Sequence, residues 1–230
     1  MLSEIIAPED LSYNSYSIRK PSGGFRTITE PNANLKIKQK IILEEMEKIS
    51  PHNSAHGFVK KRSIATNAAC HIDKEFVLNI DLKNFFPSVG PEHITKMFKR
   101  FYNVEDCSEL LKIVVYNGGL PQGSPCSPYI ANMVLYEFDE QVLEYCKELS
   151  LNYSRYADDI TISGDNFNKK IINFIYSKVN EHGFSVATDK TKLQLKSQRQ
   201  IVTGLVVNKK LNIARKDRRK IRAMYHNYDN

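Results

Sequence analysis

The sequence predicts an α+β fold in which an antiparallel or mixed sheet carries helices on one face. EFVLNIDL, residues 75–82, has the apolar, β-forming composition of a buried strand. The segment 128–149 has the periodicity of a long amphipathic helix. Two short strands, 153–157 and 160–163, then precede a helix expected over 168–182. This order of strand, helices, hairpin, helix and strand favours an α+β layer over a doubly wound nucleotide-binding fold.

The first half of the chain predicts a hairpin followed by helices. Turn-forming residues at 21–24 and at 31–32 flank FRTIT, which we expect to be a hairpin strand. Apolar residues at helical spacing predict a helix over 35–49. Beyond strand 75–82, Pro91 is placed to open a helix that ends near Phe101, and another helix is expected over 108–116.

The second half predicts two helices and the remaining strands of the sheet. Apolar residues recur every four positions from Ile130 to Cys146, which predicts one uninterrupted helix. Gly183 is placed to end the helix over 168–182. The remaining expected elements are strands at 192–196, 200–207 and 210–213 and a helix at 215–226.

Composition limits the class of protein. A chain of 230 residues suits one or two closely packed domains. It has no run of about 18 apolar residues and its first residues lack a leader pattern, so we expect no membrane partner and a cytoplasmic location. The four cysteines show no CxxC spacing, which argues for reduced thiols and against structural zinc.

The excess positive charge lies close to the C-terminus. The formal net charge is +7, and residues 209–222 contain eight basic residues and one acidic residue, which leaves 25 of each sign elsewhere. Such a cluster is either the solvated face of a helix or a surface that follows a phosphate backbone, because polyanions reward clustered Lys and Arg through counterion release.

Three aspartates predict a site for divalent cations. Asp81 ends the strand VLNID, and Asp158 and Asp159 lie 77 and 78 positions later between two short strands. If these strands are neighbours, the three carboxylates meet at one edge of the sheet, where cations relieve their repulsion. Oxygen ligands without His or Cys favour Mg²⁺, with Mn²⁺ as a substitute, and two such ions perform in-line phosphoryl transfer. A bare Asp-Asp pair is also common in turns.

A loop rich in proline and glycine precedes the long helix. LPQGSPCSPYIANM, 120–133, brings backbone and the side chain of Gln122 within reach of a flat ligand, a base or a phosphate. The same loop also reads as an ordinary helix entry, with Ser127 as N-cap and Pro128 at the first helical position. Both interpretations can hold together.

With these motifs in order, the chain resembles a reverse transcriptase. RYADD (155–159) is similar to the family's catalytic hairpin, LNIDLKNFFPSV (78–89) to its first catalytic strand, and LPQGSPCSP (120–128) to its nucleotide-pocket loop. The resemblance implies a right-hand polymerase with a ferredoxin-like palm sheet and a C-terminal thumb stub. It assigns 1–74 to the fingers, 75–208 to the palm with a helical segment at 91–118, and 209–230 to the start of a truncated thumb.

The resemblance also implies roles for single residues. Asp81, Asp158 and Asp159 would be catalytic, and together with Leu82 they would hold two metal ions. The expected dNTP contacts are Arg26, Phe86, Gln122, Gly123 and Lys190, with Phe86 as the ring that excludes a 2′-hydroxyl unless Phe85 takes that part. The expected primer and template contacts are Tyr156, Ala157, Val202, Thr203 and Gly204. The expected RNA contacts are Arg62, Asn67, His71, Arg218, Arg219 and Lys220.

Two short strings are typical of bacterial retron reverse transcriptases. NAACH, 67–71, fits the pattern NAxxH, and Val202-Thr203-Gly204 fits the pattern VTG. The retron resemblance implies a structured RNA that is both template and primer, dNTPs as substrates, an RNA–DNA hybrid, synthesis from a 2′-hydroxyl and a role in phage defence. Further candidate partners are an effector protein or a chain that supplies the thumb.

Other functions stay open at this point. Another bacterial reverse transcriptase, of the group II intron or abortive-infection type, is the nearest alternative, and a non-catalytic RNA-binding scaffold on the same fold is a second. The intact set of Asp81, Asp158 and Asp159 argues against the scaffold. A serine or cysteine hydrolase is disfavoured because no Ser-His or Cys-His arrangement with a nucleophile elbow motif is present.

Overall fold

The computed structural model describes residues 11–19 and 23–228, which form two compact units. The first unit is drawn from 1–52 and 84–137, and the second from 53–83 and 138–230. Among the described residues, none of the helices combines the length and the apolarity that crossing a membrane requires. The division into fingers, palm and thumb at 74 and 208 is a functional one and stays a proposal.

The first unit begins with the predicted hairpin and helix. Strands β1 (Tyr13–Arg19) and β2 (Phe25–Pro31) pair antiparallel, and α1 (Ala33–Met46) follows. The side chain of Asn32 caps α1 by accepting a hydrogen bond of 2.9 Å from the backbone N–H of Leu35. The predicted turn at 21–24 lies partly outside the described residues. The strand and the helix are confirmed, with the helix beginning two residues earlier than expected.

Four more helices of the first unit lie in the described part of the chain. They are α3 (Phe85–Ser88), α4 (Pro91–Tyr102), α5 (Ser108–Val114) and α6 (Ser127–Val134). Helix α4 begins at Pro91 as predicted and ends before Asn103, whose φ of 52° closes the helix in the left-handed region. The N-cap of α6 is Cys126 and not Ser127 as expected, so Ser127 is already the first helical residue.

The prediction of one helix over 128–149 is wrong. Helix α6 ends at Val134, its C-cap Leu135 has a ψ of 7°, and a separate helix α7 (Tyr136–Glu148) follows. The two helices belong largely to different units, since the unit boundary follows Glu137. The apolar repeat continues across the break because both helices bury one face, with Ile130 buried in the first unit and Val142 in the second. The repeat therefore indicates which residues are buried but does not reveal where one helix ends and the next begins.

The second unit is built on a four-stranded antiparallel sheet. Its strands are β3 (Phe76–Asp81), β4 (Asn152–Tyr156), β5 (Asp159–Gly164) and β6 (Lys192–Leu195), in the order β4-β5-β3-β6. Helix α7 connects toward β4 and α8 (Lys169–Glu181) joins β5 to β6, so the strand order and connections are those of a ferredoxin-like fold. The expected fold class is confirmed.

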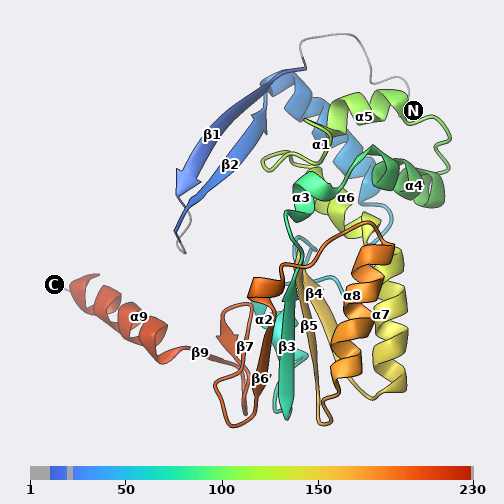
Figure 1. Cartoon of the computed structure of the whole chain (residues 1–230). Helices are drawn as coiled ribbons and strands as arrows, with labels where there is room; N and C mark the ends of the chain where they lie inside the picture. The colour runs from blue at the N-terminus through green and yellow to red at the C-terminus, as the bar shows by residue number, and fades with distance from the viewer. Residues whose placement is uncertain (1–10, 20–22, 229–230) are drawn as a thin grey trace. The chain divides into compact units, whose positions relative to one another are not determined.

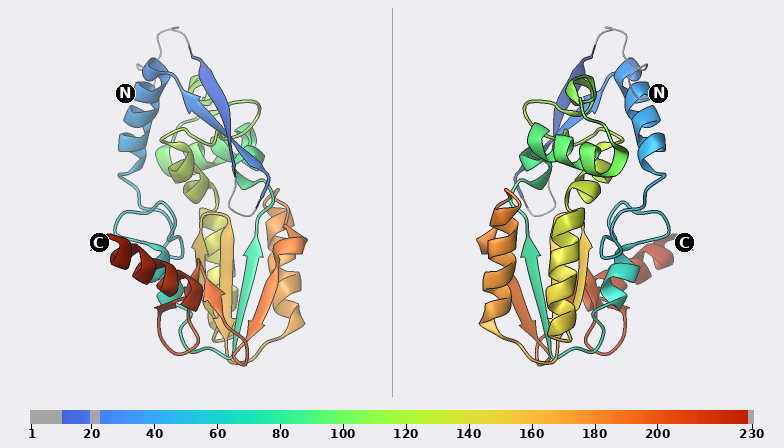
Figure 2. Two further views of the ribbon diagram at one scale, coloured as in Figure 1. Left: turned by 90° about the vertical axis from the view of Figure 1, so that its left-hand side faces the viewer. Right: turned by 90° about the vertical axis from the view of Figure 1, so that its right-hand side faces the viewer.

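Both connecting helices cover one face of this sheet (Figures 1 and 2). Helix α7 buries Phe138 and Val142 there, and α8 buries Ile175. On the sheet itself, Leu78 of β3 and Ile160 of β5 have no exposed surface. Burying these apolar side chains between the helices and the sheet is the main stabilising contribution in this unit, because each removes a large apolar area from water.

The second unit also contains a smaller sheet that packs beside the short helix α2 (Ile64–Ala69). This sheet has three strands, β7 (Ile201–Val202), β8 (Leu205–Val206) and β9 (Asn212–Ile213), and α9 (Arg215–Tyr228) follows, close to the predicted 215–226. The expected single strand over 200–207 is wrong. Thr203 and Gly204 have φ values of 45° and 83°, so they form a two-residue turn that folds the segment into a hairpin.

Candidate active site

The three aspartates meet at one end of the central strands of the second unit. Asp81 is the last residue of β3 and pairs directly with Asp159, the first residue of β5. Asp158 lies in the turn between β4 and β5, and its carbonyl accepts a hydrogen bond of 3.1 Å from the N–H of Leu82. The predicted neighbourhood of the two strands is confirmed, and sheet topology alone brings residues far apart in sequence into contact.

The carboxylates of this cluster affect one another electrostatically. Burial raises the pKa of Asp159 to about 6, the charges of Asp158 and Asp81 add to the rise, and the charge of Lys190 opposes it. Lys190 donates a hydrogen bond of 2.6 Å to Asp81 Oδ1, which raises the pKa of the Lys190 ammonium. The three carboxylates therefore carry more negative charge than Lys190 neutralises.

An open pocket of about 380 Å³ lies beside these carboxylates. Its wall includes Asp81, Asp159 and Lys190, and it continues along β3 and β6 past Asn79 and Gln194. The lining carries both carboxylates and an ammonium group. Such a pocket suits an anionic ligand with bound cations, because the ammonium group attracts the anion and the carboxylates attract the cations. Among residues 11–19 and 23–228, no three His, Cys, Asp or Glu side chains are spaced as a preformed metal cage.

The turn that carries Asp158 is held in a demanding backbone conformation. Ala157 has a φ of 56°, where residues other than glycine, asparagine and aspartate are uncommon. Gly57 lies against this turn so closely that a Cβ on Gly57 would approach Ala157 N to 2.6 Å. Tyr156, the other expected primer contact here, is the last residue of β4 and half-buried. The two roles stay predictions.

In the first unit, the loop of Gln122 is bonded to the hairpin. The N–H of Thr29 in β2 donates a hydrogen bond of 2.7 Å to the carbonyl of Gln122. Gly123 has a φ of 141°, and a Cβ there would lie 2.6 Å from Thr29 O, so only glycine fits. Arg26 is exposed on the same strand, β2. Gln122, Gly123 and Arg26, three of the expected dNTP contacts, thus belong to one bonded substructure.

A residue that the sequence did not point to fixes the other end of this loop. Gln39 of α1 is fully buried and donates hydrogen bonds to Tyr13 Oη (2.9 Å) and to Ile113 O (2.8 Å). Its Oε1 accepts a hydrogen bond of 2.8 Å from Ser124. A polar residue on an amphipathic helix is ordinarily assigned to the solvent side, so no pattern could have indicated this role.

The two adjacent phenylalanines of α3 differ in exposure. Phe85 is 2% exposed and belongs to the core of the first unit, whereas Phe86 is half-buried. Their rings meet edge to face at a centroid distance of 5.7 Å. The difference favours Phe86 over Phe85 as the ring available to a sugar, and the role itself stays a prediction.

The retron-like strings meet inside the second unit. His71 is fully buried, with Nδ1 2.7 Å from Ser163 Oγ and Nε2 2.7 Å from Ser154 Oγ. Ser154 donates to Asn67 Oδ1 at 2.7 Å, and Asn67 Nδ2 lies 3.5 Å from Thr203 Oγ1. Neither Asn67 nor His71 has exposed surface, so the RNA contact expected of them stays a prediction that would require this network to open.

The remaining expected contacts also lie in the second unit. Arg62 bonds the carbonyls of Asn53 and Ala55. Val202 is buried, whereas Thr203 and Gly204 form the turn between β7 and β8. The three contacts expected on α9, Arg218, Arg219 and Lys220, are exposed. Arg218 also donates a hydrogen bond of 2.8 Å to Asn212 Oδ1.

A ferredoxin-like sheet with three aspartates at one end of its central strands defines a polymerase palm. Residues 18–214 match the sequence family described as reverse transcriptase (RNA-dependent DNA polymerase). The chain belongs to the reverse transcriptase family. Reverse transcriptases use divalent metal ions, and the donor set of Asp81, Asp158 and Asp159, which offers only carboxylate oxygens, fits such ions.

Retron reverse transcriptases are among the curated relatives of the chain. The chain is 36% identical over 229 residues to the Retron Ec86 reverse transcriptase of Escherichia coli, covering 96% of this chain and 72% of that protein. It is 35% identical over 253 residues to the Retron Mx162 reverse transcriptase of Myxococcus xanthus, covering 94% of this chain and 52% of that protein. The chain thus spans between half and three-quarters of the length of these two relatives.

Solved structures share the fold at low sequence identity. Telomerase from Candida albicans, solved with a fragment of telomeric RNA, superposes with a TM-score of 0.61 at 12% identity over 94% of this chain and 47% of that chain. Apo telomerase from Candida tropicalis gives a TM-score of 0.60 at 12% identity, covering 90% and 50% of the two chains. At this identity the likeness supports the fold alone.

Proposed function

We propose that this chain is a retron-type RNA-directed DNA polymerase that copies a structured RNA into DNA. The observation that carries the proposal is the direct pairing of Asp81 with Asp159, with Asp158 in the adjoining turn, in a chain of this family. The identity to retron reverse transcriptases supports the retron branch over intron-type and abortive-infection enzymes.

The carboxylates would hold two Mg²⁺ ions, or Mn²⁺ in their place, together with the backbone carbonyl of Leu82. When bound, such a pair of ions activates the attacking 3′-hydroxyl and stabilises the charge on the leaving pyrophosphate. The protein's own task is to keep Asp159 deprotonated in spite of its raised pKa, and the positive charge of Lys190 assists this. Lys190 also offers an ammonium group to the triphosphate.

The nucleotide would be selected by residues of the first unit. Arg26 would pair with the triphosphate, and Gln122 and Gly123 would present side chain and backbone to the nucleotide. Phe86 would lie beneath the sugar and exclude a 2′-hydroxyl. Tyr156 and Ala157, with the turn at 202–204, would support the primer end.

The template and primer would be one structured RNA. The proposed RNA contacts are Arg62 and the exposed residues Arg218, Arg219 and Lys220 of α9. Asn67 and His71 are buried, so their proposed RNA contacts would require the hydrogen-bond network around His71 to open. In this proposal synthesis starts from a 2′-hydroxyl and yields a branched RNA–DNA product linked to phage defence. An effector protein or a chain that supplies a thumb would be a further partner.

Primer extension on an RNA template with dNTPs and Mg²⁺ tests the activity. We expect the wild type to extend and the double variant Asp158→Asn, Asp159→Asn to be inactive. Asp165→Asn, an exposed aspartate just beyond the same hairpin, is the matched control and should extend normally. Equal extension by the double variant would refute the assignment of the carboxylates. Absence of extension by the wild type on both a generic RNA and its cognate RNA would favour a non-catalytic RNA-binding scaffold.

A further inference from the structure

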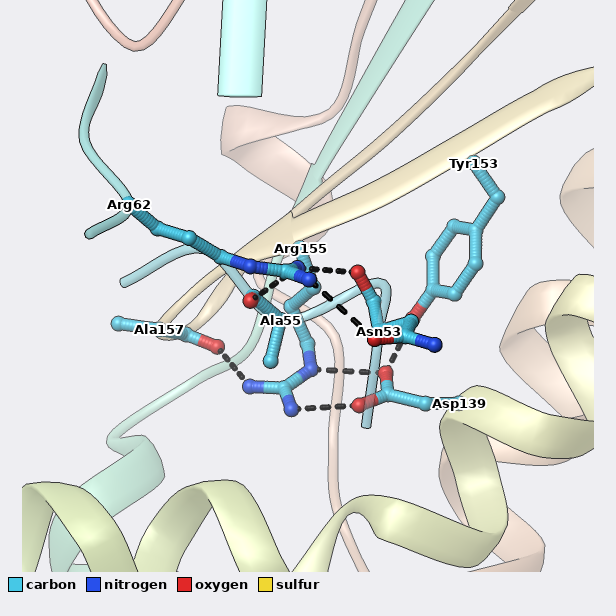
Figure 3. Close-up of polar contacts among 7 residues, drawn as sticks. All are labelled: Asn53, Ala55, Arg62, Asp139, Tyr153, Arg155 and Ala157. Carbon is cyan, nitrogen blue, oxygen red and sulfur yellow. Dashed lines mark hydrogen bonds and ion pairs between the residues drawn. The ribbon is translucent and has the colours of Figure 1, made fainter. Parts of the chain in front are cut away.

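A fully buried ion pair lies behind the catalytic hairpin. Arg155 of β4 and Asp139 of α7 have side chains with no exposed surface. The guanidinium binds the carboxylate with two hydrogen bonds, Nε to Oδ1 at 2.9 Å and Nη2 to Oδ2 at 2.6 Å (Figure 3). Such a two-point contact fixes the orientation of the guanidinium as well as its distance.

The third bond of this guanidinium reaches the turn itself. Arg155 Nη1 donates a hydrogen bond of 2.8 Å to the carbonyl oxygen of Ala157, the residue before Asp158 (Figure 3). Ala157 holds a left-handed backbone conformation, which persists at a residue other than glycine only when its surroundings impose it. The arginine therefore constrains the backbone from which Asp158 projects.

The carboxylate end of the pair is fixed in turn. Tyr153 Oη donates a hydrogen bond of 2.5 Å to Asp139 Oδ1, and its ring is buried on β4. Burial, followed by the charge of Asp139, raises the pKa of Tyr153 well above its ordinary value, so the phenol stays a donor. Burial alone would lower the pKa of Arg155, but Asp139 outweighs it and the pKa is raised. Both donors remain in the state that these bonds require.

The backbone of Arg155 is hydrogen-bonded to the segment of Ser54 and His56, on the side of β4 that faces away from β5. Its N–H donates to Ser54 O and its carbonyl accepts from His56 N–H, both at 2.7 Å. Arg62 closes this segment by donating to Ala55 O at 2.9 Å and to Asn53 (Figure 3). Backbone hydrogen bonds thus hold β4 at Arg155, and its side chain is left to contact the turn.

Stability alone is a weak reason for such a pair. Desolvating two charges costs so much that buried ion pairs are often replaced by apolar residues without loss of stability. The pair in this chain differs from a simple core contact because Arg155 also donates a hydrogen bond to Ala157 O, in the turn that carries Asp158.

We propose that Arg155, oriented by Asp139 and Tyr153, is a positioning residue that sets the geometry of Asp158 and Asp159 for nucleotidyl transfer. This inference rests on the proposed function and deepens it, because it names what holds the catalytic carboxylates in register.

The test replaces both charges at once, since removing one would strand the other. In the double variant Arg155→Met, Asp139→Leu, we expect a folded protein with kcat for nucleotide addition reduced about 10- to 100-fold and the KM for dNTP within about twofold of wild type. Tyr153→Phe, which leaves the ion pair in place, should lower kcat by a smaller factor. Val142→Ala, a buried apolar change one turn along α7, is the matched control and should keep wild-type kcat per folded molecule.

Amide hydrogen exchange of residues 156–159 without substrate gives a readout independent of activity. We expect faster exchange there in the double variant and unchanged exchange in Val142→Ala. Wild-type kcat in the folded double variant, or a fallen kcat with unaltered exchange at 156–159, would overturn the positioning role. If the wild type does not polymerise at all, the proposed function fails, while the exchange comparison still decides whether Arg155 fixes the turn.

Discussion

Lys190 donates a hydrogen bond of 2.6 Å to Asp81 across 109 positions of sequence. This contact places one positive charge beside the carboxylates of Asp81, Asp158 and Asp159, and burial raises the pKa of Asp159 to about 6. The charge of Lys190 lowers that pKa, so its removal must raise it further.

The first prediction concerns the pH dependence of synthesis. A divalent ion requires deprotonated carboxylates, so activity should fall on the acidic side as Asp159 takes up a proton. In Lys190→Gln we expect this acidic limb of kcat/KM to move to higher pH. Lys192→Gln, an exposed lysine two residues further along, should leave the limb in place. An unmoved limb in Lys190→Gln would contradict the electrostatic role.

The second prediction concerns the choice of sugar. Because Phe86 is half-buried while Phe85 is in the core, Phe86→Ala should open space for a 2′-hydroxyl without dismantling the first unit. We expect discrimination between dNTP and rNTP to fall by at least about tenfold, chiefly through improved rNTP use. Single-nucleotide incorporation with both substrates measures the ratio. Phe101→Ala, a ring on α4, serves as the control, and an unchanged ratio in Phe86→Ala would end the assignment.

The third prediction concerns stability in acid. Burial, with the charges of His56 and Lys74, lowers the pKa of His71 to about 3, whereas the unfolded chain titrates near 6.5. The unfolded state therefore binds more protons between these values, and the contribution to stability is present above pH 6.5 and lost as pH falls. By pH 4 the loss should be roughly 3 kcal/mol.

Urea unfolding between pH 7 and pH 4 measures this dependence. His71→Gln should be less stable at neutral pH and should show a flatter pH slope, because it has no buried imidazole to protonate. Val142→Ala, a buried change in the same unit that alters no titratable group, should keep the wild-type slope. If His71→Gln lost stability with the wild-type slope, another group would have to account for it. His56, whose pKa burial lowers to about 4, is the next candidate.

The sequence was most informative where functional side chains stand at the ends of segments with a clear secondary-structure pattern. Asp81, Asp158 and Asp159 stand at the ends of strongly β-forming segments, so both the strands and the meeting of their ends could be predicted. The hairpin at 203–204 could not, because β-forming residues flank Thr203 and Gly204 on both sides and read as one strand. The break at Leu135 was also hidden, since burial continues across it.

Buried polar residues were the least predictable part of the site. Arg155, Asp139 and Gln39 are charged or polar, and a hydrophobic pattern assigns such residues to the surface. Their burial depends on partners that lie far along the chain, such as Ile113 for Gln39. Only the folded structure brings donor and acceptor together, so no local signal marks these positions.

The fourth prediction concerns the basic helix α9. Arg218, Arg219 and Lys220 are exposed, and each phosphate contact that they make would release counterions. Replacing all three by Gln should weaken RNA binding and lower the slope of log K against log salt by about 2 to 3, since each contact contributes roughly 0.7 to 0.9. Binding of a structured RNA titrated at several salt concentrations measures the slope.

The control for the α9 variant must remove the same amount of positive charge from lysines that form ion pairs within the protein. Lys36, Lys99 and Lys112 lie in the first unit and contact the carboxylates of Glu30, Glu105 and Glu109 at 2.9, 2.6 and 2.6 Å. Replacing these three by Gln lowers the net charge by the same amount but should change the salt slope little, because slope counts contacts and not total charge. Equal slopes for the two triple variants would return α9 to an ordinary solvated helix face, and the RNA contacts would then have to be sought elsewhere in the second unit.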